Sequence, residues 1–543
     1  MASISQREWR HVAYFTVGVL VITTVPYLLA WWLQDRSWLF NGFVFGVEDG
    51  NAYLGKMRLG VRGYWDFFLF FTPEAHASAP LFYLPYILPG QFLGLFMDSH
   101  DPALFGWMVL TFHAMRLGFD ALLIVSIYRF IALFLDTSSQ RFMALLLACL
   151  GGGLGWLLIL IGKSNLLGDL PAEFYIPEGF SFYILYGLPH IALARALLLI
   201  GLHLLITQPR YAQAIGAGLC WAGVGLCVPF YLLVIYGILG GWGLARWLRN
   251  KRFPKAFAVQ GLLASSLTFP LLLYYLMVFN QNKAFAQWSS QNLLPSPHPL
   301  HYLLAYGILA ILAMFSLRRY LPITDTNALL IAWVLMVPLW VYLPINVQRR
   351  LAEGVLVPLA ILATPALFHV RWQMGIVVIL LLSSLLLLIG STFAVLQQTR
   401  PIYRPYDEVA ALDWLNDYAD ENAVALGTFE TGNFLPARTN LRAFLGHGPE
   451  TLYASDKRDL VDRFFADQMT EAERLSFYEQ YHIRYIFYGP LERELASHQA
   501  QPTWTHSVAL LYDYDGYQIF EVLLTCTDET CALGCHCSSL PSR

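Results

Sequence analysis

The chain has 543 residues, of which 57% are hydrophobic and 13% are charged, and its mean hydropathy is +0.51. Average domains are about a quarter charged, so this composition excludes an ordinary soluble globular protein and indicates a membrane protein. The formal net charge of −3 points to no class of partner, and we expect no nucleic-acid partner.

Long apolar runs fill most of the first four hundred residues and alternate with short polar loops. Runs such as 12–32, 142–162, 254–279 and 375–397 approach or exceed the roughly 20 residues that a helix needs to cross the hydrocarbon core. The first run has no small-residue cleavage site after it. We therefore interpret it as a retained helix rather than a removed signal peptide.

Basic residues predict which side of the membrane each loop occupies, because Lys and Arg gather in cytoplasmic loops. We place Arg7, Arg10 and the basic cluster 246–255 inside. About eleven spans follow, and we expect a multi-pass protein of the plasma membrane with a cytoplasmic N-terminus. The expected spans are 12–32, 104–134, 142–162, 190–207, a helix pair within 213–246, 256–279, 300–317, 327–343, 355–368 and 375–397.

The stretch 79–97 determines the direction of every later span. It is apolar but contains three prolines, so it either crosses the membrane or lies at its surface. If it lies at the surface, Arg129 and Arg141 are inside, as the positive-inside preference favours. We adopt the surface position, with the spanning alternative left open.

The composition changes at about residue 400 to that of a soluble protein. We therefore expect a transmembrane domain over 1–399 and an extracytoplasmic domain over 400–543. Within the second domain, 407–419 has helical spacing, while 423–429, 484–489 and 516–522 are typical of strands. The predicted fold class is an α-helical polytopic membrane protein with a small C-terminal α/β domain.

Four of the seven cysteines lie close together near the end of the chain, at Cys526, Cys531, Cys535 and Cys537. Outside the membrane, an even cluster of this kind is typical of disulfides. Metal binding with His536 is the alternative, although the spacing matches no familiar zinc motif.

Three loops on the expected outer side carry clusters of polar residues. Ionisable groups next to lipid are costly and tend to be functional. The clusters are Glu48 and Asp49 in the first loop, Glu178 and His190 in the second, and Gln348, Arg349 and Arg350 in the third.

The arginine pair of the third loop lies on the expected outer side, where the positive-inside preference disfavours basic residues. Its presence there suggests a functional role. Guanidinium groups bind phosphate through two parallel hydrogen bonds. Arg349 and Arg350, with Gln348 beside them, are therefore candidates for holding a lipid-linked phosphate. The alternatives are an ion pair with Glu353 or contact with lipid headgroups.

The acidic pair Glu48–Asp49 suits a general base or a metal ligand, because two carboxylates in a partly desolvated site favour a proton on one of them. The alternative is an exposed turn, which Gly50 would allow. Glu178 and His190 also have both a functional and a structural interpretation. For His190 the structural one is the start of a helix, where a histidine after a proline is common. No cofactor is required by the sequence, although a divalent metal would fit the acids.

The stretches 47–57 (VEDGNAYLGKM), 175–194 (YIPEGFSFYILYGLPHIALA) and 345–363 (INVQRRLAEGVLVPLAILA) carry a resemblance to the GT-C glycosyltransferases. The layout is similar to that of protein O-mannosyltransferases and lipid A aminoarabinose transferases, which use polyprenyl-phosphate sugars. The chain departs from relatives in lacking a WWD-type motif and a His-Pro-Pro signature in the first loop. These departures leave the sugar and the acceptor open.

The resemblance implies a transferase that moves a sugar from a polyprenyl-phosphate donor to a glycan, lipid or protein acceptor on the outer face. It implies that Asp49, with Glu48, is the base, that Glu178 is the second-loop acid, and that Arg349 and Arg350 hold the donor phosphate. A multi-span transporter and a non-catalytic membrane scaffold are the alternatives.

Overall fold

The computed structural model describes residues 4–207, 210–319, 321–496 and 502–523, which form two compact units. The first unit contains residues 1–68 and 76–404, and the second contains 69–75 and 405–543. The segment Leu69–Ala75, here called the strap, therefore leaves the first unit, joins the second and returns. The cysteine cluster predicted to form disulfides lies outside the described residues.

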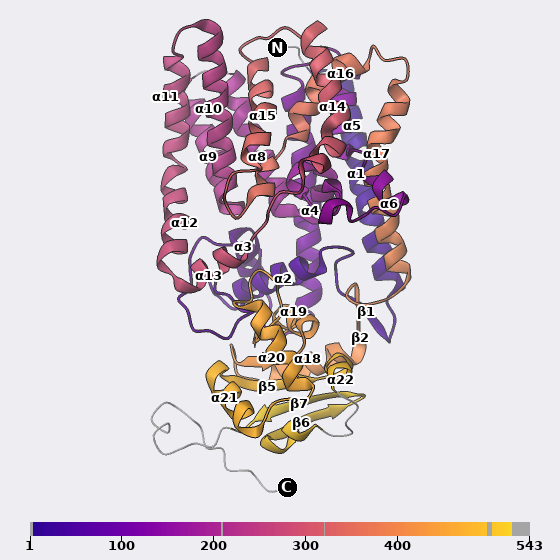
Figure 1. The fold of residues 1–543 in the computed structure, drawn as a ribbon, viewed down its shortest axis with the longest axis vertical. Helices are drawn as coiled ribbons and strands as arrows, with labels where there is room; N and C mark the ends of the chain where they lie inside the picture. The colour runs from indigo at the N-terminus through magenta and orange to yellow at the C-terminus, as the bar shows by residue number, and fades with distance from the viewer. Residues whose placement is uncertain (1–3, 208–209, 320, 497–501, 524–543) are drawn as a thin grey trace. The chain divides into compact units, whose positions relative to one another are not determined.

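The first unit is almost entirely helical (Figure 1). Its helices are α1 Gln6–Leu33, α2 Val47–Val61, α3 Leu84–Leu93, α4 Leu104–Ile131, α5 Ser138–Leu150, α6 Gly155–Leu160, α7 Ser181–Gly187, α8 Pro189–Thr207, α9 Tyr211–Cys227, α10 Tyr231–Asn250, α11 Lys255–Ser266, α12 Phe269–Gln281, α13 Lys283–Gln291, α14 Pro299–Arg319, α15 Asn327–Trp340, α16 Leu356–Leu367 and α17 Gln373–Leu396. Strands β1 Trp38–Phe40 and β2 Tyr403–Pro405 form a small sheet.

Among the described residues, six helices are long and apolar enough to cross a membrane, and a seventh span arises if the bent pair α11–α12 counts as one. The predicted count of eleven is not confirmed. Helices α5, α9, α15 and α16 are apolar but have 13, 17, 14 and 12 residues, which is shorter than the roughly 20 residues of a full crossing.

Two predicted spans are interrupted. The expected helix 142–162 breaks at Gly151–Gly153, where the amides of Gly153 and Gly155 donate to Glu173 Oε1 at 3.0 and 2.8 Å. These hydrogen bonds replace those that a continuous helix would have made. The expected helix 256–279 bends by 46° between α11 and α12, where Pro270 begins the second segment.

The stretch 79–97 forms no spanning helix. Its helix α3 has ten residues, a length of about 15 Å, which is half the thickness of the hydrocarbon core. It packs closely on α2, because Gly60 and Gly90 let the two backbones meet. A Cβ added to Gly60 would lie 2.9 Å from the Gly90 Cα.

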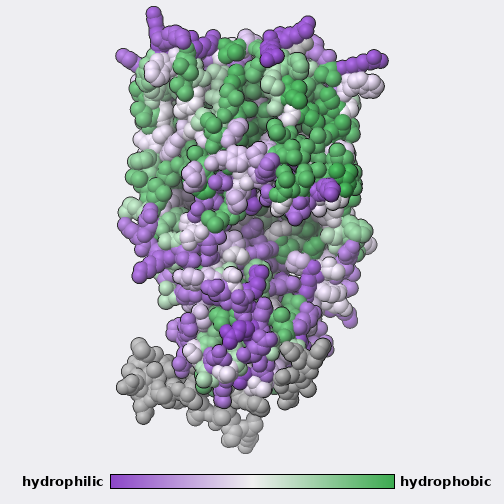
Figure 2. Space-filling view, in the orientation of Figure 1, coloured by the Kyte–Doolittle hydropathy of each residue, from purple (hydrophilic) through white to green (hydrophobic). Residues whose placement is uncertain are grey.

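One end of the first unit gathers the N-terminus and several arginines. Arg141 Nη1 pairs with Glu8 Oε1 at 2.9 Å, and the Arg129 guanidinium lies 5.5 Å from the Trp9 ring. Figure 1 places the α10–α11 turn at the same end. Hydrophilic side chains collect there, while hydrophobic ones cover much of the visible helix surface (Figure 2). The residues predicted to share the inner side therefore share one end of the unit.

The second unit contains a five-stranded mixed sheet of order β4-β3-β5-β7-β6. The strands are β3 Val424–Leu426, β4 Arg442–Ala443, β5 Ile483–Tyr488, β6 Val508–Tyr514 and β7 Tyr517–Val522, and the helices are α18 Tyr406–Tyr418, α19 Phe429–Arg438, α20 Ala454–Phe465, α21 Glu471–Tyr481 and α22 Pro490–Leu495. Strand β3 runs parallel to β4 and β5, whereas β5, β7 and β6 are antiparallel. The predicted small α/β region is confirmed.

Candidate functional site

The acidic pair of the first loop opens helix α2. Glu48 and Asp49 lie in its first turn, after Gly46, which adopts a left-handed conformation with φ of 57°. Carboxylates are favourable there, because the N-terminus of a helix carries partial positive charge. Asp49 is exposed and Glu48 is half-buried, so a substrate could reach the carboxylate of Asp49.

The second and third loops meet each other. Glu178 lies in the short helix η3 Pro177–Gly179, and Arg350 lies in η4 Gln348–Ala352. Arg350 Nε is 3.5 Å from Glu178 Oε1, with the arginine partly exposed and the glutamate buried. The Gly354 amide donates to the Glu178 carbonyl oxygen at 2.9 Å. Two of the three predicted loops therefore form one structure.

A buried ion pair stabilises this junction. Arg195 of α8 binds Glu353 through two hydrogen bonds, Nε to Oε1 at 2.6 Å and Nη2 to Oε2 at 2.8 Å. Arg195 also donates to Ser181 Oγ at 3.0 Å and to the Glu178 carbonyl oxygen. Glu353 thus pairs with Arg195. The alternative suggested by the sequence, an ion pair between Glu353 and the arginines Arg349 and Arg350, is therefore wrong.

The first loop contributes charge to the same region. The pKa of Tyr183 is raised to about 12, chiefly by burial and also by the carboxylates of Asp49 and Glu178, while Arg349 acts in the opposite direction. Burial lowers the pKa of Arg350, but Glu178, together with Tyr231, Tyr53 and Asp49, outweighs that effect and leaves the pKa raised. Asp49, Glu178 and the two arginines therefore lie within electrostatic range of shared neighbours.

Among the predicted residues, His190 is held in an aromatic cluster. Its Nδ1 is 2.7 Å from Tyr86 Oη, and its ring centroid is 5.1 Å from that of Tyr53. Asp49 and Arg350 both act electrostatically on the imidazole. These contacts fix the ring at the edge of the charged region, where it positions α2 and α3 against α8.

The two remaining residues of the third loop have different surroundings. The Arg349 guanidinium lies 4.8 Å from the Tyr175 ring centroid, a cation–π contact that leaves its planar edge for hydrogen bonding. Gln348 accepts from the Ser296 amide at 3.1 Å and donates to the Leu343 carbonyl at 2.8 Å. Both ends of its amide therefore contact backbone, and Gln348 anchors the loop.

Sequence reasoning left out several members of the cluster. Arg195 lies inside the expected span 190–207, and Tyr53, Tyr86 and Tyr183 were not among the candidate residues. The buried Lys56 lies 4.0 Å from the Tyr83 ring centroid. The signal that could have identified Arg195 is the cost of a charge in an apolar run, which predicts a partner elsewhere in the chain.

A metal centre was the alternative use suggested for the acidic residues. Within the described ranges, no group of three or more His, Cys, Asp or Glu side chains is arranged to hold a metal ion. A divalent cation at Glu48 and Asp49 would need further ligands from water or substrate.

Comparisons with known proteins bear on the fold. No family model matches the chain, and no curated protein matches it by sequence. The oligosaccharyltransferase of Archaeoglobus fulgidus in its apo form is 13% identical with a TM-score of 0.50, over 87% of this chain and 69% of that one. Its complex with zinc and sulfate has the same identity and TM-score, over 93% and 73%.

ArnT from Cupriavidus metallidurans, bound to undecaprenyl phosphate, is 13% identical with a TM-score of 0.47, over 96% of this chain and 99% of that one. At this level of identity, the likeness to the archaeal enzyme shows a shared fold. The predicted resemblance to the GT-C glycosyltransferases is confirmed in that respect.

Proposed function

We propose that this chain, which has the fold of the archaeal oligosaccharyltransferase, is a membrane glycosyltransferase that uses a polyprenyl-phosphate sugar. One observation carries the proposal. Three loops, far apart in sequence, bring an exposed carboxylate at a helix start and a pair of arginines to one region. A base and a phosphate site in proximity are what glycosyl transfer from a lipid phosphate requires.

In the proposed reaction, Asp49 accepts the proton of an acceptor hydroxyl, and the hydroxyl oxygen attacks C1 of the donor sugar. The bond between C1 and the phosphate oxygen breaks, and its electron pair remains on the lipid phosphate. Arg349 and Arg350 bind this leaving phosphate and stabilise its charge. Attack opposite the leaving group inverts the configuration at C1.

Glu178 has a supporting role in this mechanism. Its carboxylate is buried and lies 3.5 Å from Arg350 Nε, so it restrains the guanidinium before the donor binds. Restraint of this kind lowers the cost of ordering a long side chain on binding. His190 contacts Tyr86 of α3 and Tyr53 of α2, and it would act on Asp49 through the position of α2.

The assay that tests the proposal compares two site variants with two matched controls. Purified protein is incubated with undecaprenyl-phosphate sugars and a mixture of glycan, lipid and protein acceptors, and donor consumption is followed. Asp49→Asn is expected to lose about 10²–10⁴-fold in rate, the usual contribution of a general base. Arg349→Ala is expected to weaken donor binding and slow turnover.

Asp136→Asn and Arg371→Ala, at exposed positions, are the controls and are expected to retain the wild-type rate. Unchanged consumption in both Asp49→Asn and Arg349→Ala would end the assignment.

The sidedness of the site is part of the proposal: we place the site on the outer face of the plasma membrane and the N-terminus inside. Single cysteines at Ser138, an exposed residue beginning α5, and at Gln348 would report it. A membrane-impermeant maleimide added to whole cells is expected to label Gln348→Cys and not Ser138→Cys. If position 348 reacted only after the cells were opened, the donor-phosphate role would be untenable, because it requires outer arginines.

A further inference from the structure

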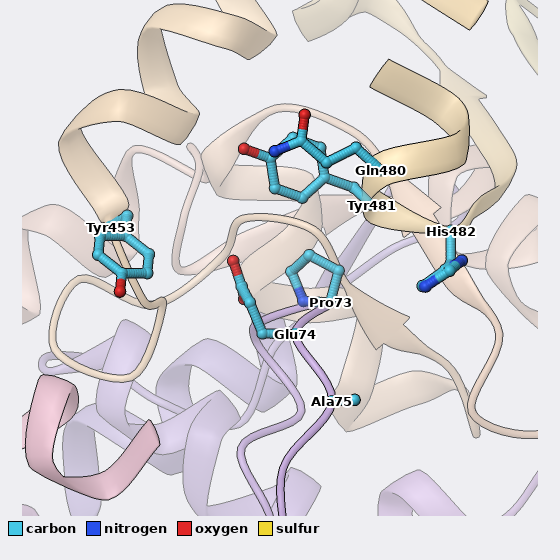
Figure 3. Close-up of a pocket in the computed structure, with 7 residues that line it drawn as sticks. All are labelled: Pro73, Glu74, Ala75, Tyr453, Gln480, Tyr481 and His482. Carbon is cyan, nitrogen blue, oxygen red and sulfur yellow. The ribbon is translucent and has the colours of Figure 1, made fainter. Parts of the chain in front are cut away.

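The second unit contains a pocket that the proposed transfer reaction does not use. Its volume is about 400 Å³, within the roughly 300–1,000 Å³ typical of small-molecule sites. It is lined by Pro73, Glu74, Ala75, Tyr453, Gln480, Tyr481 and His482 (Figure 3). Three of these residues belong to the strap, and the others lie at the start of α20 and the end of α21.

The strap forms a fixed wall of this pocket. The Ala443 amide donates to the Phe70 carbonyl oxygen at 2.9 Å, and Arg442 donates to the carbonyl oxygens of Thr72 and Glu74, the latter at 2.9 Å. These bonds tie the strap to β4. A wall that is ordered before a ligand arrives reduces the entropy cost of binding.

The polar group at the centre of the pocket is the Glu74 carboxylate. Lys457, whose side chain is 1% exposed, pairs with Glu74 Oε2 at 2.7 Å, while the Glu74 side chain remains 28% exposed. The buried ammonium offsets the negative charge of the carboxylate. The pocket therefore presents oxygen acceptors suited to hydroxyl donors without a strong field for a cation.

A tyrosine lies on each side of this carboxylate, Tyr453 on one and Tyr481 on the other (Figure 3). Tyr453 is 50% exposed and has a left-handed backbone with φ of 55°, which is costly for a bulky residue. The Tyr481 ring packs on Phe444 at 5.0 Å between centroids. The Gln480 amide next to it offers both a donor and an acceptor.

We propose that this pocket binds a pyranose unit of a saccharide. The C–H face of a pyranose ring is apolar and packs on exposed aromatic rings. Its hydroxyls match the Glu74 carboxylate as an acceptor and the amide of Gln480 as donor and acceptor. The polar groups in the walls disfavour a large apolar ligand. The Glu74 carboxylate disfavours an anion. The site lies wholly within the second unit and goes beyond the proposed transfer reaction.

The test is saccharide binding by the full chain in phospholipid nanodiscs, since maltoside detergents would compete for such a site. Saturation-transfer difference NMR is recorded with the methyl glycosides of glucose, galactose, mannose and N-acetylglucosamine. At least one glycoside is expected to give a signal, and Tyr453→Ala and Gln480→Ala are each expected to reduce it about tenfold. Tyr514→Ala, which truncates an exposed tyrosine of β6, is expected to retain it.

The site is refuted if no glycoside binds the wild-type protein, or if both pocket variants bind as well as Tyr514→Ala does. Melting curves of the variants verify that they are folded; both replaced side chains are exposed, so little stability should be lost. Donor consumption by the same nanodiscs is measured in parallel. Failure of the saccharide site is thereby distinguished from failure of the proposed transferase.

Discussion

Replacement of Glu353 by alanine is expected to destabilise the first unit by about 3–5 kcal/mol, the usual cost of removing one partner from a buried ion pair. Both side chains of the Arg195–Glu353 pair are fully buried. Without Glu353, the guanidinium would retain its charge with hydrogen bonds only to neutral acceptors, namely Ser181 Oγ and the carbonyl oxygens of Pro177 and Glu178. A lower melting temperature of the purified protein would report the loss.

The matched control is Arg249→Met, which breaks the pair between Arg249 and Asp325. This pair has a similar N–O distance of 2.6 Å, but its side chains are 42% and 37% exposed. Exposed pairs contribute about 0–1 kcal/mol, so the melting temperature should change little. Equal effects of Glu353→Ala and Arg249→Met would contradict the role given to the buried pair. The double variant Arg195→Met/Glu353→Leu should recover part of the lost stability, because no buried charge remains.

The buried pair also explains how the candidate site is positioned. Arg195 contacts the Glu178 carbonyl oxygen as well as Glu353, so it joins the second loop to the third. Arg350 and the Glu178 carboxylate meet because their backbones are fixed in this way. We therefore infer that the site depends on a charge in α8 that contacts no substrate.

Much of this arrangement follows from local features of the sequence. Hydropathy located the six long apolar helices. The distribution of charge selected three loops whose residues Asp49, Glu178 and Arg349 all act on Tyr183 in the structure. Sequence pattern also predicted strands β3, β5 and β7 of the second unit, but not β4 or β6. Both kinds of feature can be predicted from short stretches of sequence. The spacing of apolar residues indicates helices and strands, and charged residues beside apolar runs are costly near lipid and therefore indicate candidate sites.

Other features depend on contacts between distant residues and could not be predicted. Arg195 and Glu353 are 158 positions apart, and nothing near either residue identifies its partner. The break at Gly151–Gly153 depends on the Glu173 carboxylate, about twenty residues later. The strap resembles any apolar loop in sequence, and it belongs to the second unit because of hydrogen bonds to Arg442 and Ala443.

The stability of the strap is expected to depend on pH through Lys457. Burial lowers the pKa of this amine from 10.5 to about 8, although Glu74 acts in the opposite direction. Between those two values, the unfolded chain binds a proton at Lys457 that the folded chain has released. The free energy of unfolding should therefore rise with pH across this window. The rise is on the order of 3 kcal/mol, at about 1.36 kcal/mol per pH unit.

The melting temperature from pH 7 to 10.5 measures this effect as a difference between proteins, since other lysines and tyrosines titrate over the same range. The wild-type protein should gain stability relative to Lys457→Met as the pH rises through 8, because the variant has no proton to release there. Lys163→Met removes an exposed lysine and should follow the wild-type profile. If the wild-type and Lys457→Met profiles ran parallel, Lys457 would be equally protonated in the folded and unfolded chains. The Glu74 ion pair would then hold the ammonium charged, and burial would not be the dominant influence on the strap.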